Sequence, residues 1–249
     1  MENIPVIRIL AQRIQPDYEE RFLNWALEAY CPLQITIPGN EEIDLYQLVR
    51  ENPQYTKGLY IYHYANRRTP VEIRSDQRWK DITKDIETTW ASRAETVWFP
   101  AYEQIASFKK ESTNPGGNSV SEGKKLPVIH LEGYTFLNSE QERYDAWFDK
   151  SGQEAFIPLL MRLPGLREYT RYKLIDVDPT GLTAIQRIKR PIEYPPRLSI
   201  LTFDNIKAFE NYEKSLELEA FKRALEAYFP FGLNYQWYVQ YRLIRSYRK

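Results

Sequence analysis

The 249-residue sequence is poor in the side chains that most often carry chemistry, with one cysteine, two histidines and two methionines. The single thiol, Cys31, cannot form an intrachain disulfide. Charge of one sign is also lacking, because 34 basic side chains stand against 34 acidic ones and both kinds are spread along the chain. Without a phosphate-neutralising basic stripe, general binding of DNA or RNA is not expected.

Long apolar runs are missing as well. No stretch approaches the roughly 20 uninterrupted apolar residues of a membrane-spanning helix, and residues 1–8 contain charges where a signal peptide would need an apolar core. We therefore expect a cytoplasmic protein with no membrane partner. The composition, 43% hydrophobic and 14% aromatic, is that of a globular chain long enough to form two modest cores.

Motifs for metals and nucleotides are absent too. The two histidines and the cysteine lie far apart and do not have the spacing of zinc ligands, and no carboxylate cluster suggests a calcium or magnesium site. The segment 116–125 has glycine and lysine without the Walker spacing, and no Gly-x-Gly-x-x-Gly follows a predicted strand. The sequence predicts neither a metal nor another cofactor.

What the chain does contain is an internal repeat. At an offset of 122 residues, a strand-like and a helix-like segment of the N-terminal half match segments of the C-terminal half, and at an offset of 139 a later aromatic segment matches. Since the offset changes, the repeat contains insertions, and two similar units of more than a hundred residues are expected in tandem. The matched residues are Pro5-Val6-Ile7 with Pro127-Val128-Ile129, Glu20, Arg21, Phe22 and Trp25 with Glu142, Arg143, Tyr144 and Trp147, and Trp98, Phe99, Tyr102 and Ile105 with Trp237, Tyr238, Tyr241 and Ile244.

Each half predicts the order strand, helix, strand, strand, helix, strand. Alternation of side chains at period 2 indicates the strands, and apolar residues three to five apart indicate the helices. In the first half the predicted strands are 5–14, 43–49, 58–65 and 97–108, with helices from residue 17 to about 30 and from a Ser75 cap to about 90. In the second half the strands are 128–136, 169–177, 198–203 and 235–247, with helices over 138–148 and 208–225.

Three segments are expected from these patterns: a first repeat over 1–110, a linker over 111–125 and a second repeat over 126–249. The linker contains Ser-Thr-Asn-Pro-Gly-Gly-Asn, an uncharged, turn-rich run that cannot bury much surface.

The strand order predicts an α+β fold in which each repeat is a ferredoxin-like unit, a four-stranded antiparallel sheet with both helices on one face. The strands are apolar or aromatic on both faces, as Val6 and Ile7 illustrate, so each sheet needs a second cover. The economical cover is the sheet of the other repeat. We therefore expect two sheets packed face to face as an internal pseudo-dimer, either in a monomer or in a further homodimer.

Helix and turn motifs recur in the two halves. They are Glu142-Arg143-Tyr144-x-x-Trp147, Ile157-Pro158-Leu159-Leu160 and Leu163-Pro164-Gly165, echoed by Glu20-Arg21-Phe22-x-x-Trp25, Cys31-Pro32-Leu33 and Pro38-Gly39. These motifs resemble those of the dimeric α+β barrel superfamily, and most of all its EthD-like branch. The superfamily includes cofactor-free monooxygenases, cyclases, isomerases, haem proteins and members with no known reaction. The resemblance implies a cavity between the helices and the sheet of each unit.

Differences between the repeats indicate candidate catalytic residues. His130 occupies the position of Arg8 and shares its strand face with Glu132 and Tyr134. Phenolic cyclases of the superfamily use a histidine near the start of the first strand, so the resemblance implies that His130 acts as general base or acid. Glu132 would then orient the imidazole, and Tyr172 or Tyr134 would donate to an oxyanion. The alternative is a structural histidine satisfied by its neighbours.

Further candidates concern ligand binding, and each has a structural alternative. Arg8 in mid-strand either pairs with a buried carboxylate or receives an anionic ligand. Tyr62 belongs to a tyrosine stripe that either stacks on an aromatic ligand or packs between sheets. For His63 and Trp147, the alternative to ligand binding is a structural role in the core. The candidate ligand-binding residues are Tyr134, Tyr144, Trp147, Arg8, Tyr62 and His63.

The expected function is binding of a small apolar or aromatic metabolite in the second repeat, with cofactor-free cyclisation or isomerisation by acid-base chemistry. The first repeat is then mainly a structural partner. Two alternatives stay open: a haem protein that uses His130 or His63 as axial ligand, and a non-catalytic ligand-binding or scaffold protein.

Overall fold

The computed structural model describes residues 4–110, 126–137, 140–175, 193–228 and 232–249. They form two compact units, unit 1 (Met1–Gln104, Lys173–Tyr194 and Leu243–Lys249) and unit 2 (Ile105–Tyr172 and Pro195–Arg242). The predicted linker, 111–125, lies outside the described residues. The face-to-face packing of two sheets stays a prediction.

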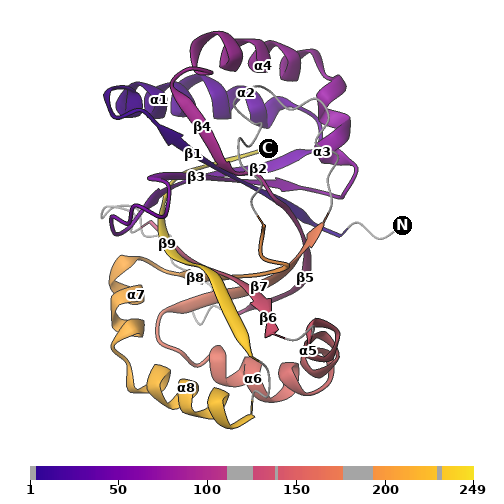
Figure 1. Cartoon of the computed structure of the whole chain (residues 1–249), viewed down its shortest axis with the longest axis vertical. Helices are drawn as coiled ribbons and strands as arrows, with labels where there is room; N and C mark the ends of the chain where they lie inside the picture. Colours follow the sequence, from indigo (N-terminus) through magenta and orange to yellow (C-terminus); the bar gives the residue numbers. More distant parts are fainter. Residues whose placement is uncertain (1–3, 111–125, 138–139, 176–192, 229–231) are drawn as a thin grey trace, which may run out of the picture. The chain divides into compact units, whose positions relative to one another are not determined.

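Unit 1 is a layer of helices over an antiparallel sheet (Figure 1). The strands are β1 (Val6–Ile14), β2 (Asn40–Leu48), β3 (Gly58–Tyr64), β4 (Ala94–Trp98) and β5 (Ala101–Lys109). The helices are η1 (Pro16–Tyr18), α1 (Glu19–Trp25), the π-helical η2 (Ala26–Tyr30), α2 (Cys31–Thr36), α3 (Thr69–Glu72), η3 (Ile73–Ser75) and α4 (Gln77–Thr89).

The register of β1 on β3 fixes which side chains face the helices. Leu10 lies opposite Tyr60 and Arg8 opposite Tyr62, and Leu10, Tyr60 and Tyr62 belong to one core with Phe22 of α1. Since side chains alternate along a strand, His63 points to the opposite face of the sheet from Tyr62. The tyrosine stripe of β3 therefore belongs to the helix-side core.

The strand predicted over 97–108 is two strands. It breaks at Phe99–Pro100 into β4 and β5, and both pair with β1. Proline has no N–H to donate to a ladder, although its carbonyl still accepts from the Ile9 N–H at 3.0 Å. One proline therefore divides an otherwise continuous β pattern.

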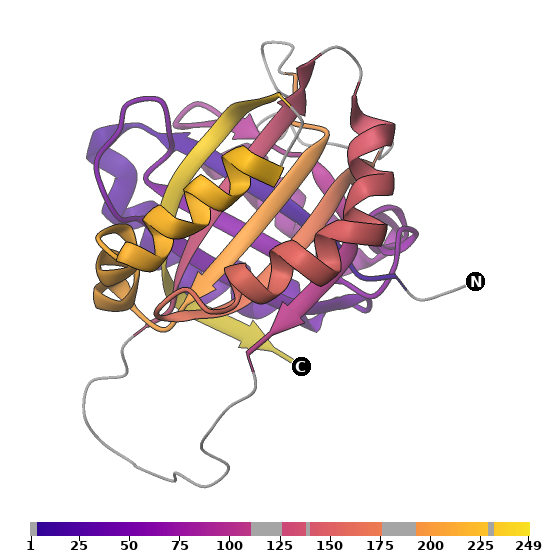
Figure 2. The same cartoon turned by 90° about the horizontal axis from the view of Figure 1, so that it is seen from below.

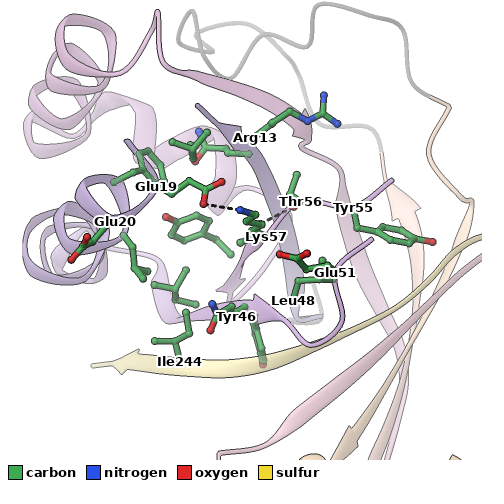
Figure 3. Close-up of a pocket in the computed structure, with 18 of the residues that line it drawn as sticks. Arg13, Glu19, Glu20, Tyr46, Leu48, Glu51, Tyr55, Thr56, Lys57 and Ile244 are labelled. Atoms are coloured by element: carbon green, nitrogen blue, oxygen red, sulfur yellow. Dashed lines mark hydrogen bonds and ion pairs between the residues drawn. The ribbon is translucent and has the colours of Figure 1, made fainter. Parts of the chain in front are cut away.

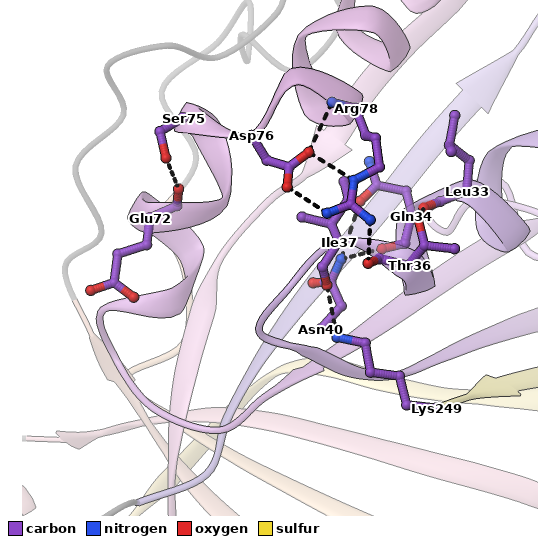
Figure 4. Close-up of polar contacts among 10 residues, drawn as sticks. All are labelled: Leu33, Gln34, Thr36, Ile37, Asn40, Glu72, Ser75, Asp76, Arg78 and Lys249. Atoms are coloured by element: carbon purple, nitrogen blue, oxygen red, sulfur yellow. Dashed lines mark hydrogen bonds and ion pairs between the residues drawn. The ribbon is translucent and has the colours of Figure 1, made fainter.

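The cap of α4 also differs from the prediction. Ser75 donates its hydroxyl to the Glu72 carbonyl at 2.8 Å, while Asp76 is the N-cap and accepts from the Arg78 N–H at 2.8 Å. The Arg78 guanidinium binds the same carboxylate and also the Thr36 carbonyl (Figure 4). The cap therefore joins the start of α4 to the end of α2.

Unit 2 has the same kind of layering, with its helices over one face of its strands (Figure 2). β6 pairs antiparallel with β8 and β9, and β5, β7 and β9 each contain residues of both units. The strands are β6 (Val128–Phe136), β7 (Leu166–Ile175), β8 (Arg197–Phe203) and β9 (Leu233–Arg248). The helices are α5 (Gln141–Trp147), the π-helical η5 (Phe148–Gly152), α6 (Gln153–Leu160), α7 (Ile206–Glu213) and α8 (Leu216–Tyr228).

The helix predicted over 208–225 is interrupted between α7 and α8. The Ser215 hydroxyl accepts from the Leu218 N–H at 3.1 Å and donates to the Tyr212 carbonyl at 2.9 Å. A serine that binds backbone groups on both sides ends one helix and caps the next.

Both Pro-Gly turns place glycine in the left-handed region. Gly39 has φ +94° and Gly165 has φ +72°. A Cβ on Gly165 would lie 2.6 Å from the Ala208 Cβ. These turns therefore need glycine both for its backbone freedom and for close packing. Among the described residues, no helix is long and apolar enough to cross a membrane.

Candidate functional sites

The side chains of His130, Glu132 and Tyr134 face the helices of unit 2. The His130 ring lies 5.9 Å from Phe209 of α7, and the Tyr134 hydroxyl lies 3.2 Å from that of Tyr144 of α5. Because β6 alternates, Glu132 between them points the same way. The structure thus brings this sequence-predicted set together under the helix layer.

His130 is fixed by hydrogen bonds at both ring nitrogens. The Gln240 side-chain amide donates to Nδ1 at 2.8 Å, so Nε2 has the proton and donates to Glu132 Oε1 at 3.2 Å. The residue is 1% exposed, and Tyr238 packs edge-on against it at 4.4 Å. The imidazole is thereby held in one tautomer and one orientation, and it positions the carboxylate of Glu132.

Glu132 stands among tyrosines. Burial is the main cause that raises the pKa of Tyr169, Tyr212, Tyr235 and Tyr238, and the negative charge of Glu132 raises each further. For Tyr238 the pKa rises to about 12. Tyr235 and Tyr238 are 46% and 55% exposed, so aromatic surface lies open to solvent near this carboxylate.

Arg171 is a buried cation in the same layer. Its guanidinium lies 3.4 Å from the centre of the Phe148 ring, and the residue is 1% exposed. Among the described residues, Nε and Nη2 have no hydrogen-bond partner, although Nη2 lies 3.9 Å from Asp145 Oδ1. Asp145 itself is bound through both oxygens by Arg197. Donors buried without acceptors are rare and costly, which marks this position as a candidate anion site.

Tyr169 links Arg171 to Glu132. Burial raises the pKa of Tyr169 first of all, the Arg171 charge lowers it, and the Glu132 charge raises it. Its hydroxyl lies 3.1 Å from that of Ser199. A carboxylate, a phenol and a guanidinium are therefore neighbours on one sheet face.

Tyr172 does not join this group, because it directly follows Arg171 in β7 and points to the other face. Tyr144 lies in the cluster through its hydroxyl contact with Tyr134. Trp147 is half-buried and packs against Tyr144, with ring centres 6.2 Å apart. Arg171 and Gln240 are not among the sequence-predicted residues, although Arg171, like Arg8, is an arginine in mid-strand.

The candidates of unit 1 are separated by the sheet. Arg8 is 4% exposed and lies over the Phe99 ring at 4.5 Å, and burial lowers its pKa. The Tyr62 and Tyr30 hydroxyls meet at 2.6 Å in the core. His63 lies on the opposite face, where Nε2 is 3.2 Å from Asp44 Oδ2.

A pocket of ≈ 840 Å³ lies in unit 1 between α1 and the strands (Figure 3). Phe22, Leu45 and Tyr60 form part of its wall, and at its rim Lys57 binds Glu19 at 2.8 Å. Pockets of this size hold small organic molecules. None of the sequence-predicted site residues lines this pocket among the described residues. Its position between helices and sheet is nevertheless the one that the family resemblance implied.

Comparison with known proteins matches no family model and no curated protein, but solved structures share the fold over nearly the whole chain. A candidate monooxygenase from Fusobacterium nucleatum subsp. nucleatum has a TM-score of 0.61 at 10% identity, covering 100% of this chain and 96% of its own. An anthrone oxidase-like protein has a TM-score of 0.59 at 12% identity, and the match covers 99% of this chain and 94% of that protein. A candidate chlorite dismutase has a TM-score of 0.55 at 12% identity, and the match covers 98% of this chain and 96% of that protein. These likenesses show a shared fold, so the predicted α+β fold class is confirmed.

Proposed function

We propose that the chain is an enzyme that transforms a small aromatic substrate by cofactor-independent acid-base chemistry on the helix side of unit 2. The observation that supports this most is the bond from His130 Nε2 to Glu132, with Gln240 occupying the other ring nitrogen. The structural neighbours include a candidate monooxygenase and an anthrone oxidase-like protein, which fits an aromatic substrate.

The roles differ from those expected from sequence. Glu132 is the proton acceptor, because it is the more exposed member of the pair, with side-chain exposures of 21% against 1%. His130 is the positioning residue that orients it. The two unpartnered donors of Arg171 stabilise an oxyanion, because preorganised donors in a buried site act most strongly on developing charge.

The proposed reaction is redox-neutral. Glu132 removes a proton from an acidic carbon or hydroxyl of the substrate, and the electron pair moves onto a carbonyl or phenolic oxygen that faces Arg171. The resulting enolate or phenolate then attacks a carbonyl carbon of the same molecule, whose π electrons move onto its oxygen as that oxygen takes back the proton from Glu132, or it is reprotonated at another atom by Glu132. The first outcome is cyclisation and the second is isomerisation. Oxygenation would in addition consume molecular oxygen.

The test is turnover of a panel of anthrones and phenolic β-diketones, followed by chromatography and oxygen uptake. Glu132→Gln removes the base and should lower kcat by about 10²-fold or more, while the exposed Glu142→Gln on α5 serves as control and should leave it unchanged. His130→Gln should lower kcat less than Glu132→Gln. Full activity of Glu132→Gln on a substrate that the wild type turns over would overturn the assignment.

A haem function fits the residues poorly. An axial imidazole needs a free ring nitrogen, whereas both nitrogens of His130 are hydrogen-bonded. We therefore expect no Soret shift when haemin is added to the purified chain. A shift abolished by His63→Ala or His130→Ala would favour the haem alternative.

Binding without chemistry is the second candidate, and the pocket of unit 1 favours it. Gln47 is exposed and lines this pocket, whereas Glu41 is exposed on the same strand outside it. If the pocket binds an aromatic metabolite, Gln47→Trp should weaken binding of 1-naphthol in a fluorescence titration, and Glu41→Trp should not. If the chain binds 1-naphthol but turns over no member of the substrate panel, a function as a ligand carrier is supported.

We further propose that the chain is a tandem pair of ferredoxin-like units, EthD-like in type. Element bounds support this: β1 and β6, α1 and α5, and η2 and η5 are each offset by 122 residues, and β3 and β8 by 139. A π-helical turn is rare, so its recurrence at a fixed offset argues for duplication. Light scattering of the purified chain would distinguish a monomeric pseudo-dimer from a homodimer.

A further inference from the structure

Three potential ligands meet on the face of unit 1 opposite its helices. Glu42 and Asp44 are two residues apart on β2 and therefore point the same way, and the register places Glu42 directly opposite His63 of β3. One donor atom from each of the three lies within 4.8 Å of the other two. The sequence did not reveal this cluster, because the antiparallel pairing of β2 and β3 assembles it.

Asp44 is the member least satisfied by the protein. It is 8% exposed, and its Oδ2 accepts from the Tyr46 hydroxyl at 3.3 Å and contacts His63 Nε2 at 3.2 Å. Within the described part of the chain, Oδ1 has no hydrogen-bond partner. A buried carboxylate oxygen with no partner is costly, which points to a ligand.

Glu42 is oriented by the end of β9. The Ser246 hydroxyl and the Arg248 guanidinium both donate to its Oε1, at 2.7 and 2.6 Å, and neither bond uses Oε2. The Arg248 side chain is 72% exposed, so water screens its charge and this ion pair is weak. These donors hold the carboxylate in place in the way that outer-shell groups orient metal ligands.

We propose that Glu42, Asp44 and His63 bind one divalent transition-metal ion of the zinc type, with water completing its coordination. Two carboxylates and one imidazole are ligands that zinc accepts at about 2.0–2.2 Å. The donor atoms need small side-chain rotations to reach that geometry. The cation offsets the charge of the two carboxylates and is coordinated by Asp44 Oδ1. It also replaces the contact between His63 and Asp44. Imidazole disfavours magnesium and calcium here.

The test is calorimetric titration of ZnCl₂ into the full-length chain after chelator treatment, with MgCl₂ for comparison. One equivalent of Zn²⁺ should bind, Mg²⁺ should not compete, and the thermal midpoint should rise. Asp44→Asn and His63→Gln should each weaken Zn²⁺ binding at least tenfold. The neighbouring exposed Glu41→Gln on the same strand is the matched control and should bind as the wild type does.

Circular dichroism of each variant checks folding. If Asp44→Asn fails to fold, Glu42→Gln and His63→Gln carry the test. A cobalt-substituted chain should show visible d–d absorption, and His63→Gln should lose or shift it. The proposal would be overturned if the wild type does not bind Zn²⁺, or if Glu42→Gln and His63→Gln bind Zn²⁺ with the affinity of the wild type. The function proposed for unit 2 depends on Glu132 and stands or falls separately.

Discussion

At the residue scale, the strongest functional indication is a buried guanidinium with unsatisfied donors. Among the described residues, Arg171 Nε and Nη2 have no hydrogen-bond partner, and the residue is 1% exposed, so these two donors cost stability. A group that costs stability is more simply explained by a ligand than by packing.

Replacing Arg171 with Met should therefore abolish turnover without loss of stability. The methionine keeps apolar contact with Phe148 and removes the two unsatisfied donors, so the free energy of unfolding in urea should stay within about 1 kcal/mol of wild type or rise. Arg197→Met is the comparison, because it strips the partner from Asp145 and should cost about 2 kcal/mol or more. A large loss of stability in Arg171→Met would instead mean that the guanidinium is structural.

Residue identity alone predicted part of this site. His130, Glu132 and Tyr134 share a parity on one strand, so their common face followed from the sequence. Gln240 reaches His130 through the pairing of β6 with β9, over 110 residues of chain. No local pattern encodes such a pairing. The pattern of β7 also does not show which of its faces meets the helices, so it indicated Tyr172, whose side chain points to the other face.

At the element scale, the start of α4 depends on one capping side chain. Asp76 caps α4 and binds Arg78 (Figure 4), and the hydrogen bond from the Arg78 side chain is the main reason that the pKa of Asp76 falls to about 2. A depressed carboxyl pKa adds stability above the ordinary pKa near 4, and this contribution is lost as the pH falls toward 2.

We expect Asp76→Ala to lower the urea midpoint at pH 7 and to have a smaller difference from wild type at pH 2. Asp76→Asn keeps a capping oxygen but should lose the part of the stability that depends on pH between 2 and 4. Ser75→Ala is the control and should change the midpoint much less. If Ser75→Ala is the more damaging substitution, the cap assigned from sequence is the correct one.

The sequence predicted elements better than their ends. β6 has the predicted bounds of 128–136, because its alternation is uninterrupted. The breaks at Pro100 and Ser215 were missed because hydrophobic periodicity continues across them, while the missing N–H of proline and the two backbone bonds of serine act locally.

At the scale of the whole molecule, each compact unit combines segments that are far apart in the sequence. Unit 1 includes Leu243–Lys249 from the far end of the sequence. There the Tyr247 hydroxyl donates to the Leu27 carbonyl at 2.7 Å, and Lys249 Nζ donates to the Ile37 carbonyl at 2.9 Å. The last strand thus stabilises the helices of the first half.

Deleting residues 243–249 should therefore destabilise unit 1 although no residue of 1–110 changes. The deletion removes the partner of β2 at one edge and exposes unpaired backbone groups. We expect a lower thermal midpoint and a larger exchange of backbone amides in β2 by hydrogen-exchange mass spectrometry. Deleting Lys249 alone is the milder control. Unchanged exchange in β2 after the longer deletion would contradict this account.

The sequence by itself determined the order of strands and helices and which side chains of a strand share a face, because these depend on residues near one another in the chain. Tertiary structure decided which parities meet: the register of β6 against β9 gave Glu132 its oriented imidazole, and that of β2 against β3 assembled Glu42, Asp44 and His63. Register depends on side-chain packing between distant segments, and a shift of one residue would exchange the two faces of a strand.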